Sequence, residues 1–146
     1  MGYPMTYQRV LSRNKTRDFD LGDILSVTDG ALVSPRHIDG VYDILGYMTG
    51  ESLMTHQLPR CSRECQPDLL AQHPQLDGVG LPDDVERTME GVMAWLDTQK
   101  VIYGESLSVE PLAEGQHEYR DALAELDQMA GNRPVIVVHP EDFRDA

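Results

Sequence analysis

The sequence predicts an α+β fold, in which a helical N-terminal half packs on a small three-stranded sheet with two amphipathic helices. Three observations lead to this prediction. Apolar residues repeat at helical spacing in the first half, two more helical repeats follow in the second half, and three short runs there have the composition of strands. With 146 residues, of which 40% are hydrophobic and 25% charged, the chain has the size and composition of one globular domain.

The first helix is predicted over residues 20–28. Asp20 is a suitable N-cap, and Gly30 follows as a helix stop. Asp29-Gly30 also fits the tight turn of a hairpin between two short strands, and we favour the helix over this alternative.

A second helix is predicted between Ser34 and Gly50, with Ser34 as the cap and Pro35 in the first turn. Gly50 is a typical helix stop. The apolar side chains repeat at the spacing of one helical face: Ile38, Val41, Tyr42, Leu45 and Met48.

Pro59 and Pro67 then predict two short helices, Pro59–Cys65 and Pro67–Gln72, because proline is accepted in a first turn and rejected inside a helix. The loop over residues 77–82 is rich in glycine and closed by a proline, so it is the best boundary between the two halves.

In the second half, a helix is predicted from Pro82, followed by two strands and a last helix over Gln116–Ala130. The buried stripe of the first of these helices is expected to be Val85, Met89, Val92, Met93 and Leu96. That of the last helix is expected to be Tyr119, Ala122, Leu123, Leu126 and Met129. The three predicted strands are Val101–Tyr103, Ser106–Glu110 and Val135–Val138.

Charge divides the chain into a basic leader over residues 1–17 and an acidic body over residues 18–146. We interpret the body as a single α+β domain with a helical part (18–76) and an acidic α/β part (82–146). The leader has four basic residues and no acidic one, whereas the whole chain has 25 Asp and Glu against 12 Lys and Arg, a net charge of −13.

This charge argues against direct binding to nucleic acid or to an anionic membrane, because both would repel the body. It favours a protein partner with a basic surface, such as a nucleic-acid-binding protein, although a merely solubilising surface has the same composition. Association with further copies of the chain stays open. No apolar run reaches the roughly 20 residues of a membrane span, and the N-terminus lacks the pattern of a signal peptide, so we expect a cytoplasmic protein.

Two polar clusters are candidates for binding a small anion. Arg36 and His37 lie at the start of the second predicted helix, where exposed amides favour negative charge. His56, Gln57 and Arg60 lie on a predicted loop, where ligand contacts are often found. An ordinary capped helix and a solvated loop would have the same residues.

Metal binding and proton transfer have weaker support. His56, Cys61, Cys65 and His73 match no standard zinc spacing, so we predict no metal site and no cofactor. His139 with Asp142, after the third predicted strand, is a possible general base with an orienting acid. Polar residues after a strand are equally typical of a solvated tail.

An acidic stripe is predicted on the last helix. Glu118, Asp121 and Glu125 share one side at helical spacing, and Glu114 extends the row. Such a stripe can imitate a row of phosphates, although most acidic helix faces are only solvated.

The run over residues 20–28, the segment over 37–50 and Thr55–Arg60 together resemble a family of small, uncharacterised proteins from bacteriophages and prophages. The resemblance covers about residues 18–76 and is most recognisable at Thr55–Arg60. It implies no activity and no catalytic residue. It does imply an accessory viral protein that acts inside the bacterial cytoplasm.

Three functions follow as hypotheses. The first is a non-enzymatic phage accessory protein that binds a host protein, for example a defence or nucleic-acid-binding component, through the acidic surface. The second is a binder or hydrolase of a small, nucleotide-like anion that uses His37, His56 and Arg60. The third is a virion or assembly component.

Overall fold

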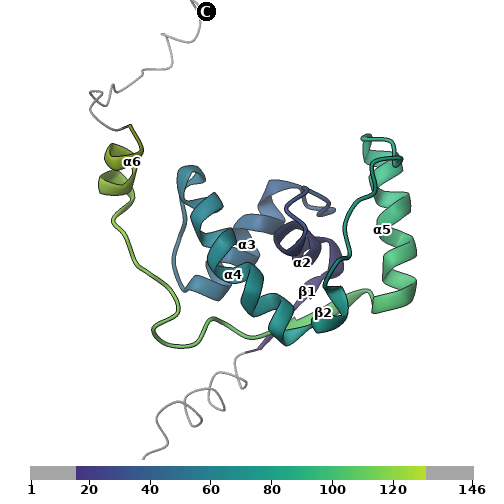
Figure 1. Cartoon of the computed structure of the whole chain (residues 1–146), viewed down its shortest axis with the longest axis horizontal. Coiled ribbons are helices and arrows are strands. Elements are labelled where there is room, and N and C mark those ends of the chain that lie inside the picture. The colour runs from purple at the N-terminus through teal and green to yellow at the C-terminus, as the bar shows by residue number, and fades with distance from the viewer. Residues whose placement is uncertain (1–15, 131–146) are drawn as a thin grey trace, which may run out of the picture.

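The structure, a computed structural model, describes residues 16–130 and has a mixed helix and sheet fold (Figure 1). The described chain contains five α-helices, two strands and two 3₁₀ helices. In chain order these elements are β1 (Arg17–Asp20), α2 (Leu21–Thr28), α3 (Ile38–Thr49), η1 (Thr55–Gln57), α4 (Leu58–Gln72), η2 (Pro74–Leu76), α5 (Met89–Tyr103), β2 (Ser106–Val109) and α6 (Ala122–Ala130).

The described sheet has two strands, with β1 antiparallel to β2 and Phe19 opposite Leu107. The predicted strand at Ser106–Glu110 is therefore confirmed as β2, whereas its partner β1 was not predicted. The predicted strand at Val101–Tyr103 is wrong, because these residues form the last turn of α5. The predicted strand at Val135–Val138 and the pair His139 and Asp142 lie outside the described residues.

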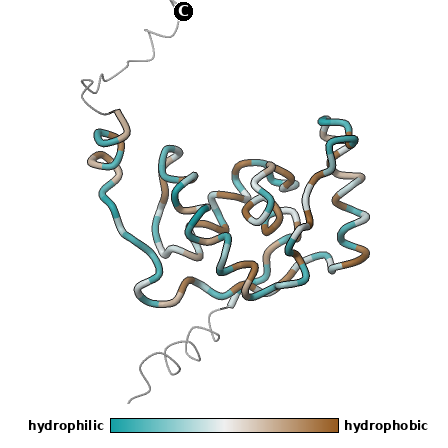
Figure 2. Tube along the Cα trace, viewed as in Figure 1, coloured by the Kyte–Doolittle hydropathy of each residue, from teal (hydrophilic) through white to brown (hydrophobic). Residues whose placement is uncertain are grey.

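Helix α2 is the centre of the core, since all eight of its residues are buried. Helices α3, α4 and α5 and strand β1 all pack against it. Figure 2 shows hydrophobic chain gathered in this central region, whereas the connection from β2 to α6 is largely hydrophilic. The buried apolar side chains outside α2 include Phe19, Val33, Ile44, Leu45, Met48, Leu58, Cys61, Cys65, Leu69, Leu76, Leu96 and Val109.

The predicted cap of α2 is confirmed, because the Asp20 carboxylate accepts a hydrogen bond from the Gly22 amide at 2.8 Å. Gly22 is also a point of close approach. A Cβ atom there would lie 2.7 Å from Pro35 Cδ and 2.9 Å from Leu96 Cδ2. The hairpin alternative at Asp29-Gly30 is excluded by this helix.

Helix α3 begins at Ile38, later than the predicted cap at Ser34, and ends at Gly50 as predicted, with a φ of 77°. Ser34 holds the preceding turn instead, since its hydroxyl accepts a hydrogen bond from the Arg36 amide at 3.0 Å. The same hydroxyl donates to Asp23 of α2 at 2.5 Å. A side chain at Gly40 would overlap both of these groups.

The two predicted short helices are one continuous helix, α4, with Pro67 inside it. A proline inside a helix costs roughly 3 kcal/mol, because one backbone hydrogen bond is lost and the ring crowds the preceding turn. The buried residues of α4 lie on the same face of the helix before and after this proline. The packing of this face against α2 and α3 outweighs the local cost of the proline. The apolar residues of this face are Leu58, Cys61, Cys65 and Leu69.

Helix α5 begins seven residues after the predicted start at Pro82. Residues 82–85 form a turn closed by a hydrogen bond from the Val85 amide to the Pro82 carbonyl. Thr88 is the N-cap, since its hydroxyl accepts a hydrogen bond from the Gly91 amide at 3.0 Å. Within the predicted stripe of this helix only Leu96 is fully buried, and Met89 is exposed.

Helix α6 begins at Ala122, not at Gln116, because Asp121 caps it through a hydrogen bond from the Ala124 amide at 3.1 Å. The predicted apolar stripe of this helix is also wrong. Leu123 and Met129 are exposed, as is Tyr119 before the helix, whereas Glu125 is buried. None of the helices in residues 16–130 is both long and apolar enough to span a membrane.

Candidate functional site

The predicted anion-binding loop and the predicted acidic stripe meet in the structure. Residues 116–126 lie against η1 and the start of α4. The Arg60 guanidinium forms two hydrogen bonds to the Glu125 carboxylate, at 2.6 and 3.0 Å, and Gln57 donates to the same carboxylate at 3.2 Å. We name this contact region the junction: residues 51–64 on one side and residues 116–126 on the other.

Main-chain carbonyl groups make further contacts around the Arg60 and Glu125 pair. Arg60 also donates to the Glu118 carbonyl at 2.8 Å, and Gln57 donates to the Arg120 carbonyl at 3.3 Å. The His56 ring nitrogen Nε2 lies 2.8 Å from the Ala122 carbonyl, so it donates there. These three side chains hold the start of α6 against α4.

The charges of the Arg60 and Glu125 pair stabilise one another. The Glu125 side chain is 4% exposed, and the hydrogen bond from Arg60 lowers the pKa of Glu125 to about 2. The same contact raises the pKa of Arg60 above its usual value. Glu125 is thus a buried internal partner in the structure, while Glu114, Glu118 and Asp121 are exposed.

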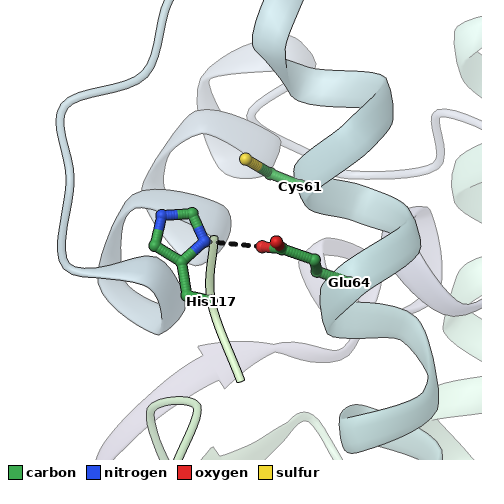
Figure 3. Close-up of side chains that lie close together, drawn as sticks. All are labelled: Cys61, Glu64 and His117. Carbon is green, nitrogen blue, oxygen red and sulfur yellow. Dashed lines mark hydrogen bonds and ion pairs between the residues drawn. The ribbon is translucent and has the colours of Figure 1, made fainter. Parts of the chain in front are cut away.

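The other half of the junction centres on His117. Its Nδ1 atom lies 2.6 Å from a Glu64 oxygen (Figure 3). Its Nε2 atom contacts the Glu51 carboxylate. Burial lowers the pKa of His117, but the hydrogen bonds to both carboxylates outweigh burial, so that the pKa is raised overall. The buried thiol of Cys61 lies on the same side of α4 as Glu64 (Figure 3).

The four residues that were considered as a zinc set, His56, Cys61, Cys65 and His73, do not lie together in the structure. His56 bonds to Ala122, and His73 lies 2.7 Å from the Ser108 carbonyl near the sheet. Cys61 and Cys65 are buried one turn apart on α4, and burial raises their pKa values to about 11 and about 12. Among the described residues, Cys61, Glu64 and His117 instead bring one sulfur, oxygen or nitrogen atom each within 4.8 Å of one another.

Arg36 and His37, the other predicted anion-binding cluster, do not belong to the junction. They lie directly before α3. Arg36 forms ion pairs with Asp23 at 2.5 Å and with Asp43 at 3.0 Å. His37 is exposed and has a φ of 59°, which is rare for a residue with a side chain. No described contact connects either residue with His56 or Arg60.

A hollow of about 240 Å³ opens beside the Arg60 and Glu125 pair. Its lining includes four basic side chains, of which the sequence analysis missed two, Arg63 and Arg120. The signal for Arg63 was present, because residues 60 and 63 share a helix face. No local pattern indicated Arg120. The hollow is lined by His56, Pro59, Arg60, Arg63, Arg120, Glu125, Gln128 and Met129.

Residues 77–105 contain a second group of exposed acids, separate in sequence from Glu114, Glu118 and Asp121. The basic residues in this stretch are Arg87 and Lys100, and each lies close to an acid. Arg87 lies 3.8 Å from Asp83, and Lys100 is paired with Asp20 at 2.7 Å. We name the exposed acids of this stretch the acidic face. They are Asp77, Asp83, Asp84, Glu86, Glu90, Asp97 and Glu105.

Residues 19–79 of the chain are similar to a family described as a domain of unknown function (DUF7736). No curated protein and no solved structure matches the chain. The matched residues include η1, α3 and α4, and thus His56, Arg60 and Glu64. They do not include α5 or His117, so the acidic face and the second side of the junction lie almost entirely outside the match.

Proposed function

We propose that this chain is a non-enzymatic accessory protein that binds a partner protein with a basic surface through the acidic face. The observation that carries the proposal is the state of α5. This helix of 15 residues buries only Leu96 fully and packs mainly on α2, so its outward side is left exposed. Figure 1 shows it at one end of the molecule, beyond the central helices.

The outward side of α5 combines charge with apolar surface. Glu90, Asp97 and Val101 fall on one side of the helix at i, i+7 and i+11 spacing, and all three are exposed. Val101 is 87% exposed and its neighbour Ile102 66%. Exposed apolar side chains surrounded by charge are typical of protein interaction sites.

Charge complementarity supports a partner with a basic surface. An excess of carboxylates steers a basic protein toward the face and repels nucleic acid and anionic membranes. If the resemblance to phage and prophage proteins reflects kinship, the partner is a bacterial host protein, for example a defence or nucleic-acid-binding component, and the complex forms in the host cytoplasm.

Charge reversal with a matched control tests this function. The variant carries Glu90→Lys and Asp97→Lys, and the control carries Glu114→Lys and Asp127→Lys, which change the same number of exposed acids. Proteins captured from a bacterial lysate by the wild type are identified, purified and titrated against all three proteins. We expect a basic partner whose dissociation constant rises at least about tenfold for the α5 variant only.

Ionic strength provides the second arm of this experiment. Raising it from about 0.01 M to about 0.15 M shortens the screening length from about 30 Å to about 8 Å, so binding must weaken. Equal affinity of the α5 variant and the wild type would contradict the proposal. Weakening by the control variant alone would instead assign binding to Glu114 and its neighbours.

The hollow beside Arg60 supports a second candidate function, the binding of a small anion. Four basic side chains line this opening, and only Arg60 among them is paired with the Glu125 carboxylate of the lining. Calorimetric titration with inorganic phosphate and pyrophosphate tests it, with Arg63→Gln as the variant and Arg87→Gln as the control. Binding that is lost in the first variant and kept in the second supports an anion site, whereas absence of binding to the wild type rejects it.

A further inference from the structure

We propose that Cys61, Glu64 and His117 form a binding site for a single transition-metal ion of the zinc class. The site is independent of the acidic face and belongs to the junction. Its three residues come from two segments, since Cys61 and Glu64 lie on α4 and His117 lies in the connection between β2 and α6. One ligand atom from each residue lies within 4.8 Å of the other two.

The side chains point toward a common space (Figure 3). Cys61 and Glu64 are three residues apart on α4, so both project from one face of the helix. The His117 ring faces them from the opposite side, with Nδ1 2.6 Å from the Glu64 oxygen. The Cys61 thiol is fully buried and has no described hydrogen bond, so its sulfur is free to bind an ion there.

The surrounding contacts orient these ligands. The Glu51 carboxylate contacts Nε2 of His117, which leaves Nδ1 as the nitrogen that faces Glu64. A carboxylate on the far nitrogen of a histidine ligand is the usual outer contact of zinc sites. The second oxygen of Glu64 accepts a hydrogen bond from the Glu118 amide at 3.0 Å, so this carboxylate is also held in place.

The donor set selects the kind of ion. Magnesium and calcium prefer oxygen ligands alone, whereas Zn²⁺ accepts sulfur, nitrogen and oxygen in one tetrahedral site. Three protein ligands leave a fourth position for water or for a group from another molecule. The Glu51 and Glu64 carboxylates give the region negative charge, and the Cys61 thiol would release its proton when a divalent cation binds its sulfur.

An ion at this position would connect α4 to the connection that leads into α6. Metal binding should therefore stabilise the docking of residues 116–126, because ligands from two segments are joined by one ion. Cys65, although equally buried and one turn away, is not part of the set. It therefore serves as the matched control for Cys61.

Titration of the metal-free full chain with Co²⁺ under reducing conditions tests the site, since cobalt bound to a thiolate has a distinctive charge-transfer absorption. We expect one equivalent to bind with that absorption and to be displaced by Zn²⁺. The absorption should disappear in Cys61→Ser and persist in Cys65→Ser. Glu51→Gln should keep the absorption and weaken binding by about 10- to 100-fold.

A second variant covers the risk that Cys61→Ser, in the core, fails to fold. His117→Gln changes a side chain outside the helices, and circular dichroism verifies its fold. We expect it to lose at least about 100-fold in Co²⁺ affinity, while the control His73→Gln binds like the wild type. Absence of the thiolate absorption in the wild type, or loss of it in Cys65→Ser alone, would overturn the proposal.

Discussion

Glu125 shows, at the scale of single residues, how its surroundings change the role of an acidic side chain. Helical spacing alone places it on a solvated stripe, but in the structure it accepts hydrogen bonds from Arg60 and Gln57 and is nearly buried. Removing its charge leaves the Arg60 guanidinium without its main partner. Leaving a buried polar group without its hydrogen-bond partner typically costs about 1–3 kcal/mol, and more where the group is charged.

The first prediction concerns the pH dependence of this pair. The folded pKa of Glu125 is lowered from 4.5 to about 2, so its contribution to stability is fully present above about pH 4.5 and is lost as the pH falls toward 2. The stability difference between the wild type and Glu125→Gln should therefore shrink over this interval. Urea unfolding at several pH values measures it.

Glu114→Gln is the control for this prediction, since Glu114 is exposed and has no described contact. Its stability should follow that of the wild type through the same pH interval. A constant difference between Glu125→Gln and the wild type from pH 5 down to about pH 2 would contradict the pairing with Arg60.

At the scale of elements, local signals predicted some boundaries and failed at others. Asp20 and Gly50 act within one turn of their helices, so the sequence was sufficient for the start of α2 and the end of α3. Val101–Tyr103 has the composition of a strand, but Lys100 is held to Asp20 of β1 and Leu96 is in the core, which keeps the segment helical. Tertiary contacts outweighed propensity there.

The second prediction tests the start of α5. If Thr88 is the N-cap, Thr88→Ala removes the hydroxyl that accepts from Gly91 and should lower the free energy of unfolding by about 1 kcal/mol. If the helix began at Pro82, residue 88 would be in its interior, and alanine would be neutral or stabilising. Chemical unfolding distinguishes the two, with Thr98→Ala as the control inside the helix.

The third prediction concerns Pro67, which is exposed in the middle of α4. Pro67→Ala restores a backbone donor without changing the core, so stability should rise by roughly 1–3 kcal/mol. Pro59→Ala is the control, because Pro59 lies in the first turn, where its ring is compatible with the helix. A lower melting temperature for Pro67→Ala would show that the ring itself makes a needed contact.

At the scale of the whole molecule, the junction explains why the site was harder to predict than the fold. His117 meets Glu51 and Glu64 across 66 and 53 residues, and no periodicity or spacing connects positions so far apart. His56, Gln57 and Arg60 were recognised as a polar cluster, but their partners in residues 118–125 were interpreted as a separate surface. Only the folded chain shows that each cluster completes the other.

The fourth prediction also belongs to the whole molecule and follows from its net charge of −13. Repulsion among exposed acids destabilises the compact state and is screened by salt, whereas the buried pair of Arg60 and Glu125 is screened much less. The melting temperature should therefore rise between about 0.01 M and about 0.15 M salt. The double variant Glu90→Lys with Asp97→Lys has a net charge closer to zero, so the melting temperature of this variant should rise less over the same interval.

Partner binding through the acidic face should change in the opposite direction, because the same screening weakens attraction between two proteins. A melting temperature that falls with salt would mean that exposed ion pairs, such as Arg17 with Asp43, stabilise the fold more than the excess of acids destabilises it.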